Sequence, residues 1–230
     1  MSDEDSSYEQ LDEEQYVNLV PGNWFELKNI NRSKTFPYGI DDFKNELINQ
    51  IINRSEKLET INSPFLNRYK NTKIDDIEFY LPDTKFNEIV AKCETETRHP
   101  VIAFHGSTKD AVDSILKTGY SIPKIDNKNI RVRNGSMYGL GVYTSPFFDK
   151  AISYSPVCPN DKYMRLIVNI VFLGKMKLIP PIPSRNNLSD PVNGFYADNS
   201  NTRVVYGLEQ IISAKSDNVI PIAIIKSKHN

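Results

Sequence analysis

Three stretches of the chain carry apolar residues at helical spacing, which predicts amphipathic helices over residues 41–58, 85–92 and 110–118. Gly119 directly follows the third stretch and suits the position after a helix, because glycine takes positive φ at little cost. We expect the first helix to pack on the domain itself rather than on a partner. The apolar stripes consist of Phe43, Leu47, Ile51 and Ile52 in the first helix, Phe86, Ile89 and Val90 in the second, and Ala111, Val112, Ile115 and Leu116 in the third.

The remaining apolar segments are short runs that predict strands. They cover residues 77–81, 101–104, 164–172, 203–206 and 219–225. Pro82 ends the first run, and Pro221 interrupts the last one. After residue 100 the strands outnumber the helices and do not alternate with them as regular βαβ units, so the pattern favours an α+β fold.

The N-terminal region differs from the rest of the chain. Residues 2–18 are acidic and poor in aliphatic side chains, so we expect a flexible tail over 1–18. An extension with one helix over 19–75 and a main domain over 76–230 complete the predicted organisation. The acidic start is unlike a signal peptide, and no apolar run approaches the ~18 residues of a membrane span. We therefore expect an intracellular protein, cytoplasmic or nuclear, without a membrane partner.

Charge and cysteine content exclude several classes of function. Lys and Arg number 28 against 29 Asp and Glu, and a net charge of -1 creates no overall field that would recruit nucleic acid. Cys93 and Cys158 lie far apart and lack a nearby Cys or His partner, so we interpret them as reduced thiols rather than as a zinc site or a disulfide.

Three short blocks after residue 100 carry candidate chemistry. His105-Gly106-Ser107 follows an apolar strand, and three glycines in 135–143 precede an aromatic strand that ends at Tyr143. Tyr154 lies on a helix-like stretch over 147–155. Taken singly, each block has an ordinary structural explanation: a hydrogen-bonded histidine at a strand end, a glycine-rich hairpin and a surface tyrosine.

Together, the blocks resemble the donor site of poly(ADP-ribose) polymerase-like ADP-ribosyltransferases. That family follows the pattern His-Gly-Ser/Thr, then Tyr/Phe-Gly-x-Gly-x-Tyr, then Lys-Ser/Ala-x-x-Tyr. The matching runs here are 105–107, 138–143 and 150–154, in the same order and without gaps inside any block. The resemblance covers about 77–225 and implies two packed mixed or antiparallel sheets that form an NAD cleft, so that 76–230 would be the catalytic domain.

The resemblance also implies roles for individual residues. The backbone of Gly106 would pair with the nicotinamide carboxamide, and Tyr143 and Tyr154 would sandwich the pyridinium ring by stacking and cation–π attraction. His105 would hydrogen-bond the adenosine ribose. NAD would be a substrate, and no metal would be needed, because nicotinamide leaves readily from its cationic form. The expected cofactor-binding residues are His105, Gly106, Ser107, Tyr138, Tyr143 and Tyr154.

A third catalytic element of the family lies on a later strand, where members that extend polymers have glutamate and mono-ADP-ribosyltransferases often have an uncharged residue. Two registers compete here. Thr202 precedes Val-Val-Tyr and a downstream glutamine, Gln210, as in the family, whereas Glu209 keeps the charge but discards that match. We prefer Thr202, which makes His105, Tyr143 and Thr202 the expected catalytic residues. A hydroxyl retains only a hydrogen bond, worth ~1 kcal/mol net, so this choice favours single transfer over polymer extension.

Two further departures limit the resemblance. Ala151 occupies the place of a serine that binds the carboxamide in polymer-forming members, unless Ser153 or a water replaces that contact. An arginine that several members place near Ser121 is missing; Arg131 and Arg133 are candidates for its role and equally for solvated loop charges.

These observations predict mono-ADP-ribosylation of protein side chains, the chain itself included, with release of nicotinamide. The alternative is a catalytically silent domain of the same fold that binds NAD or a partner. Removal of a 2′-phosphate from RNA is a third hypothesis, which the near-neutral charge does not support.

Overall fold

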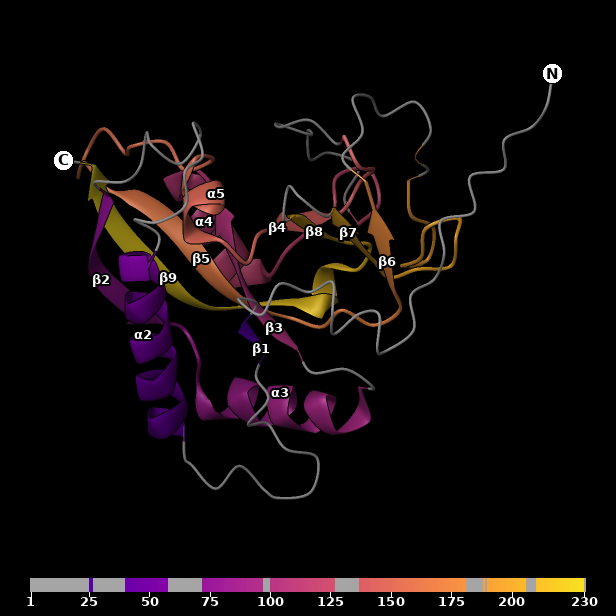
Figure 1. The fold of residues 1–230 in the computed structure, drawn as a ribbon, viewed down its shortest axis with the longest axis horizontal. Helices are drawn as coiled ribbons and strands as arrows, with labels where there is room; N and C mark the ends of the chain where they lie inside the picture. The colour runs from indigo at the N-terminus through magenta and orange to yellow at the C-terminus, as the bar shows by residue number, and fades with distance from the viewer. Residues whose placement is uncertain are drawn as a thin grey trace.

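Two β-sheets form the framework of the protein (Figure 1). The computed structural model describes residues 25–26, 40–57, 72–96, 100–126, 137–180, 188, 190–205 and 210–229. The first sheet has five antiparallel strands in the order β1 (Phe25–Glu26), β3 (Val101–Gly106), β5 (Met164–Val171), β9 (Val219–His229) and β2 (Thr72–Phe79). The second has four, in the order β4 (Val142–Thr144), β8 (Gln210–Ser213), β7 (Thr202–Val205) and β6 (Met176–Ile179).

This arrangement confirms the α+β class and the five strands that the apolar runs predicted. The pattern did not predict β6 or β8, because each has only two consecutive apolar residues, Leu178-Ile179 and Ile211-Ile212, which are too few to show the two-residue strand period. Only β6 and β7 run parallel among the pairs of the second sheet. The N-terminal tail, Glu209, Arg131 and Arg133 lie outside the described residues.

The two sheets meet at β3. Its outer edge pairs first with β1 at residues 101–102 and then, further along, with the residue that follows β4. There the Phe104 N–H donates to the Ser145 carbonyl oxygen at 2.7 Å, and the Ser145 N–H donates to the Phe104 carbonyl oxygen at 2.9 Å. This junction places the last residues of β3 beside β4.

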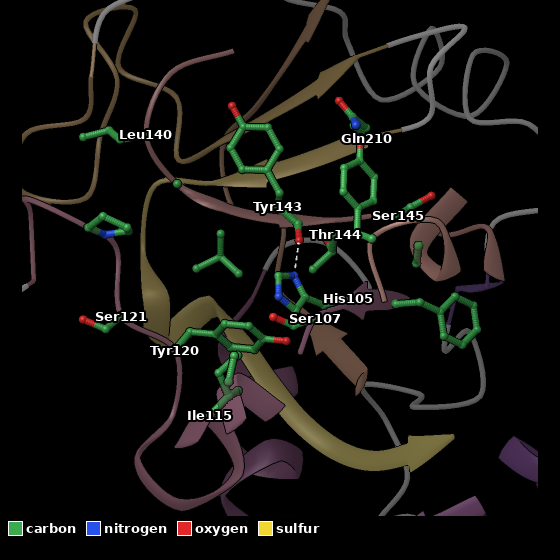
Figure 2. Close-up of a pocket in the computed structure, with 18 of the residues that line it drawn as sticks. His105, Ser107, Ile115, Tyr120, Ser121, Leu140, Tyr143, Thr144, Ser145 and Gln210 are labelled. Atoms are coloured by element: carbon green, nitrogen blue, oxygen red, sulfur yellow. Dashed lines mark hydrogen bonds between the residues drawn. The ribbon is translucent and has the colours of Figure 1, made fainter. Parts of the chain in front are cut away.

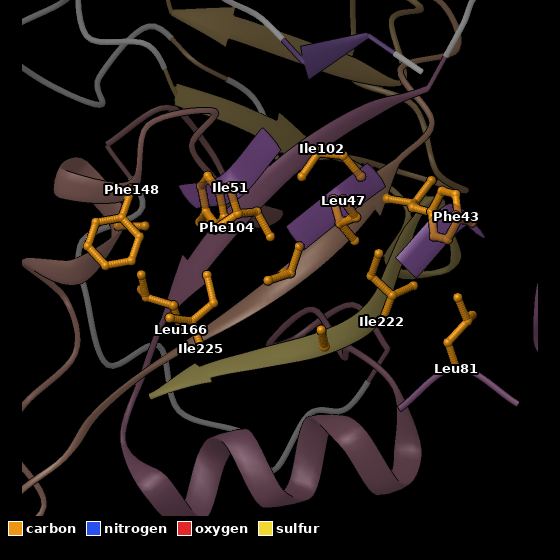
Figure 3. Packing of buried hydrophobic residues seen from close by; sticks show 14 of the residues in the cluster. Phe43, Leu47, Ile51, Leu81, Ile102, Phe104, Phe148, Leu166, Ile222 and Ile225 are labelled. Atoms are coloured by element: carbon orange, nitrogen blue, oxygen red, sulfur yellow. The ribbon is translucent and has the colours of Figure 1, made fainter. Parts of the chain in front are cut away.

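One face of the five-stranded sheet carries α2 (Ile40–Lys57), α3 (Asp83–Thr95) and the short α5 (Phe148–Ile152). Alternate residues of β3 and β5 point into this core, and Figure 3 shows Phe43, Leu47 and Ile51 of α2 packing on them. The first helix thus packs on the domain, as predicted. Ile52 was wrongly assigned to its apolar stripe: it is 41% exposed, because it lies a further 100° around the helix than Ile51.

The opposite face of the sheet is covered by α4 (Lys109–Thr118) and by the second sheet. The Thr108 hydroxyl caps the start of α4 by accepting a hydrogen bond from the Ala111 N–H, and Gly119 ends the helix at φ +80°. A 3-10 turn over Ser216–Asn218 leads into β9. Within the described part of the chain, no helix is long and apolar enough to cross a membrane.

Candidate active site

A cavity of about 740 Å³ lies where the two sheets part (Figure 2). Its walls are the end of β3, α4, the turn before β4, β4 itself, α5 and the first residue of β8. The volume is within the range of ligand pockets. Among the described residues that line the cavity, Asp110 and Lys150 carry charge, and most of the remaining surface is apolar or aromatic.

His105, near the end of β3, has a defined protonation state. Its Nδ1 lies 2.7 Å from the carbonyl oxygen of Tyr143. Because a carbonyl can only accept, Nδ1 must carry the proton, and Nε2 is left as a hydrogen-bond acceptor. Burial lowers the pKa of His105, which favours this neutral form. His105 is therefore an acceptor at neutral pH rather than a cation.

The side chain of Tyr143 is held by the turn that precedes its strand. Its hydroxyl donates to the carbonyl oxygen of Gly139 at 2.6 Å and accepts from the N–H of Tyr138 at 3.0 Å. Gly139 sits at φ +90°, a conformation that a side chain would strain. Tyr138 is itself buried and lines the cavity. The Tyr143 ring is consequently a fixed aromatic wall.

Gly106 allows α5 to approach the end of β3. A Cβ at this position would collide with the carbonyl oxygen of Ala151, so no larger residue fits. A side chain at residue 106 would therefore displace helix α5. This close packing brings Lys150, Ala151 and the 44%-exposed Tyr154 to the cavity wall.

The hydroxyl missing at Ala151 is not supplied by Ser153. The Ser153 hydroxyl donates to the carbonyl oxygen of Lys150 at 2.7 Å, and Ser153 does not line the cavity. Ser107 does line it. The cavity therefore gathers the cofactor-binding residues expected from the three blocks: His105, Gly106, Ser107, Tyr138, Tyr143 and Tyr154.

Thr202 is not brought to this cavity. It is fully buried in β7, where it pairs with Ser213 of β8 and Met176 of β6, and it does not line the cavity. Because β8 lies between β7 and β4, about 10 Å separates β7 from the strand of Tyr143. The expectation that Thr202 completes the site thus finds no support in its position.

Gln210, the first residue of β8, lines the cavity instead (Figure 2). The sequence pattern used Gln210 only to set the register of Thr202 and did not indicate that it lines the cavity. The available signal was one polar residue before a short apolar run, Ile211-Ile212. Such a run cannot reveal which strand lies beside β4.

Comparisons with known proteins agree with this geometry. The model of the poly(ADP-ribose) polymerase catalytic domain family matches residues 55–227. The fold is similar to that of the PARP domain of Arabidopsis RADICAL-INDUCED CELL DEATH1, with a TM-score of 0.52 and 12% sequence identity over 77% of this chain and 98% of that one. No curated protein sequence matches the chain. Because the family model covers most of the sequence, the chain belongs to the poly(ADP-ribose) polymerase catalytic domain family.

Proposed function

We propose that this protein binds NAD in the cavity and transfers a single ADP-ribose unit to a protein side chain, releasing nicotinamide. The observation that carries the proposal is the convergence of His105, Tyr143 and Tyr154 on one cavity in a chain of this family. Catalytic domains of the family use NAD as a substrate. The acceptor would be a protein side chain, including one of this chain.

The nicotinamide ring would bind between Tyr143 and Tyr154. Offset stacking and cation–π attraction to the positively charged ring each contribute on the order of 1 kcal/mol. The immobilised phenol of Tyr143 supports this, because a ring that is already fixed loses little side-chain entropy when the ligand binds. The backbone of Gly106 would pair with the carboxamide.

His105 would accept a hydrogen bond from a ribose hydroxyl through Nε2. The carbonyl of Tyr143 supports this role, because it occupies the Nδ1 proton and leaves Nε2 as the acceptor. One hydrogen bond of this kind contributes ~1 kcal/mol net. Its larger value lies in holding the ribose while the bond to nicotinamide breaks.

Gln210 would take the third position of the site. Its amide can hydrogen-bond the nicotinamide ribose, but it lacks the negative charge that would stabilise the oxocarbenium-like state. A charged group there contributes ~3 to 4 kcal/mol, against ~1 kcal/mol for a neutral hydrogen bond. A neutral amide is also no general base, so the acceptor must supply its own nucleophile. This supports slow, single transfer.

Labelled NAD provides the test. Wild-type protein should release nicotinamide and become labelled, whereas His105→Ala and Tyr143→Ala should lose most of both signals while remaining folded. Phe195→Ala is a matched control, because it removes a 38%-exposed aromatic ring that does not line the cavity. Wild-type-like labelling in both cavity variants would refute the proposal.

A second candidate is a silent domain that binds NAD without turnover. Two observations favour it: the cavity presents Ala151 where polymer-forming relatives carry serine, and on the β8 side it presents the neutral Gln210 rather than a carboxylate. It predicts that NAD raises the melting temperature of the wild-type protein without any release of nicotinamide, whereas the transferase predicts both.

A further inference from the structure

Asn169 is a polar residue in the middle of an apolar strand. It belongs to β5, whose eight residues are all buried, and its own exposed fraction is 0%. A buried amide without hydrogen bonds would cost several kcal/mol. Asn169 avoids this cost, because its Nδ2 donates to the carbonyl oxygens of Ala103 at 3.2 Å and of Ile167 at 3.1 Å.

These two bonds determine how the amide points. Both partners are carbonyls, which only accept, so the NH2 group of Asn169 must face them and Oδ1 must face away. The hydroxyl of Tyr120 lies 2.9 Å from that oxygen and therefore donates to it. Tyr120 is thus anchored to the centre of the five-stranded sheet by a bond whose direction is unambiguous.

Tyr120 reaches the sheet because α4 ends at Gly119. The N–H of Gly119 closes the last helical turn on the carbonyl of Ile115 at 2.8 Å, and its φ of +80° redirects the chain. Tyr120 then packs beside Ile167 and lines the cavity next to His105 (Figure 2). The two rings meet edge to face, with centroids 5.3 Å apart and planes at 84°.

We propose that Asn169 and Tyr120 are positioning residues that hold the His105 ring in the one orientation where Nδ1 donates to Tyr143 and Nε2 is left to accept from a ligand. In the register of β3 and β5, Ala103 opposes Asn169 and His105 opposes Ile167, so these four side chains share one face of the sheet. The Tyr143 carbonyl holds one edge of the imidazole, and the anchored Tyr120 ring packs against it. The ligand-binding part of this inference rests on the proposed function.

A purely structural role for Asn169 is the competing explanation. Asn169 lies opposite Pro221 of β9, where the strand register shifts, and proline has no N–H to donate to the ladder. The amide would then serve only to satisfy nearby carbonyls. That role involves Ala103 and Ile167, but it does not require the hydroxyl of Tyr120, which lies 49 residues away in the chain.

The variant Tyr120→Phe separates the two explanations, because it keeps the ring and removes only the anchoring hydroxyl. Tyr80→Phe is the matched control: it also removes a tyrosine hydroxyl that donates to a side-chain oxygen, Oε1 of Glu78 at 2.6 Å, and neither residue lines the cavity. The readouts are the imidazole nitrogen resonances of His105 followed against pH and the affinity for NAD. With only three histidines in the chain, His105→Gln identifies the signals of His105.

We expect Tyr120→Phe to weaken NAD binding about fivefold, as expected for one lost hydrogen bond, and to raise the pKa of His105 because water reaches a loosened ring. Tyr80→Phe should change neither value. Wild-type resonances and affinity in Tyr120→Phe, or equal changes in both variants, would overturn the inference. If wild-type protein does not bind NAD, the proposed function fails, and the resonances of His105 alone decide whether Tyr120 positions it.

Discussion

Strands β7 and β8 are neighbours in the same sheet, yet only one of them reaches the cavity. They pair over their whole length, from Thr202 opposite Ser213 to Val205 opposite Gln210, and both are largely buried. The difference is their second neighbour: β8 also pairs with β4, through Ile212 opposite Tyr143, whereas β7 pairs with β6. Whether a strand reaches the cavity therefore depends on its position in the sheet. It does not depend on how apolar the strand is or on how closely its sequence matches the family pattern.

β7 nevertheless supports the site from behind. Arg203 is 2% exposed, donates to the carbonyl oxygen of Tyr138 at 2.9 Å, and lies 3.7 Å from the ring centre of Tyr196. Tyr138 in turn donates its N–H to the hydroxyl of Tyr143. Thus β8 contributes a side chain to the cavity, while β7 braces the turn that holds the aromatic wall.

The largest contrast should come from placing glutamate in each strand. Thr202→Glu buries an unpaired carboxylate and should lower the free energy of unfolding by ~3 to 5 kcal/mol, enough to unfold many proteins. Gln210→Glu should fold and raise nicotinamide release at least about tenfold, because the charge stabilises the oxocarbenium-like state. Denaturation curves and nicotinamide assays measure the two effects. A Thr202→Glu protein that folds and releases nicotinamide faster would instead indicate that β7, and not β8, supplies the third residue of the site.

Truncating the native side chains of Gln210 and Thr202 should change activity and stability less than adding glutamate does. Gln210→Ala should reduce nicotinamide release about fivefold to tenfold, as expected for a lost hydrogen bond to a developing charge. Thr202→Val should leave that rate unchanged and raise the free energy of unfolding by ~1 kcal/mol, because the Thr202 hydroxyl is buried without a hydrogen-bond partner among the described residues. Nicotinamide release and the free energy of unfolding should be measured for both variants. Slower nicotinamide release by Thr202→Val would indicate that Thr202 belongs to the site.

Glu209 offers a direct check on the choice of Gln210. It precedes Gln210 in the chain and was the charged alternative at the third position. Glu209→Gln should keep nicotinamide release within about twofold of wild type if Gln210 takes that position, because no essential charge is then lost. A loss on the order of a hundredfold would instead identify Glu209 as the catalytic acid.

Helix α5 contributes Ala151 to the cavity wall, against Gly106, whose backbone we propose pairs with the carboxamide. Ala151→Ser should tighten NAD binding about fivefold by adding one hydrogen bond, worth ~1 kcal/mol. Ala214→Ser, directly after β8, is the control: this residue is also buried but does not line the cavity. Titration with NAD should detect a gain at Ala151 only. Equal affinities in both variants would mean that residue 151 does not meet the ligand.

The pH dependence should separate His105 in the cavity from Asp149, which does not line it. Burial lowers the pKa of His105 below its unfolded value of ~6.5, so the unfolded state binds more protons and stability falls as pH drops through and below that value. Burial raises the pKa of Asp149 from 3.8 to about 6. The folded state therefore binds more protons at this residue, and the free energy of unfolding falls as pH rises from 3.8 to about 6. The free energy of unfolding, measured against pH, should lose the dependence due to His105 in the variant His105→Gln. It should lose the dependence due to Asp149 in the variant Asp149→Asn.

The sequence by itself determined the helices, the α+β class and most of the cavity. Helical periodicity marks α2, α3 and α4 because it needs only neighbouring turns, and the blocks around His105, Tyr143 and Tyr154 are each local in the chain. A local block keeps its spacing wherever the strands lie, so these residues could be identified without coordinates.

Only the tertiary structure decided which later strand lines the cavity and which ring lies against His105. Strand order is a non-local property: β7 and β8 are separated by four residues but differ in their partners from distant parts of the chain. The bond between Tyr120 and Asn169 likewise joins residues 49 positions apart. Neither the strand order nor this hydrogen bond can be predicted from the hydrophobic pattern. That pattern indicates which side chains are buried, but not which strands lie beside one another.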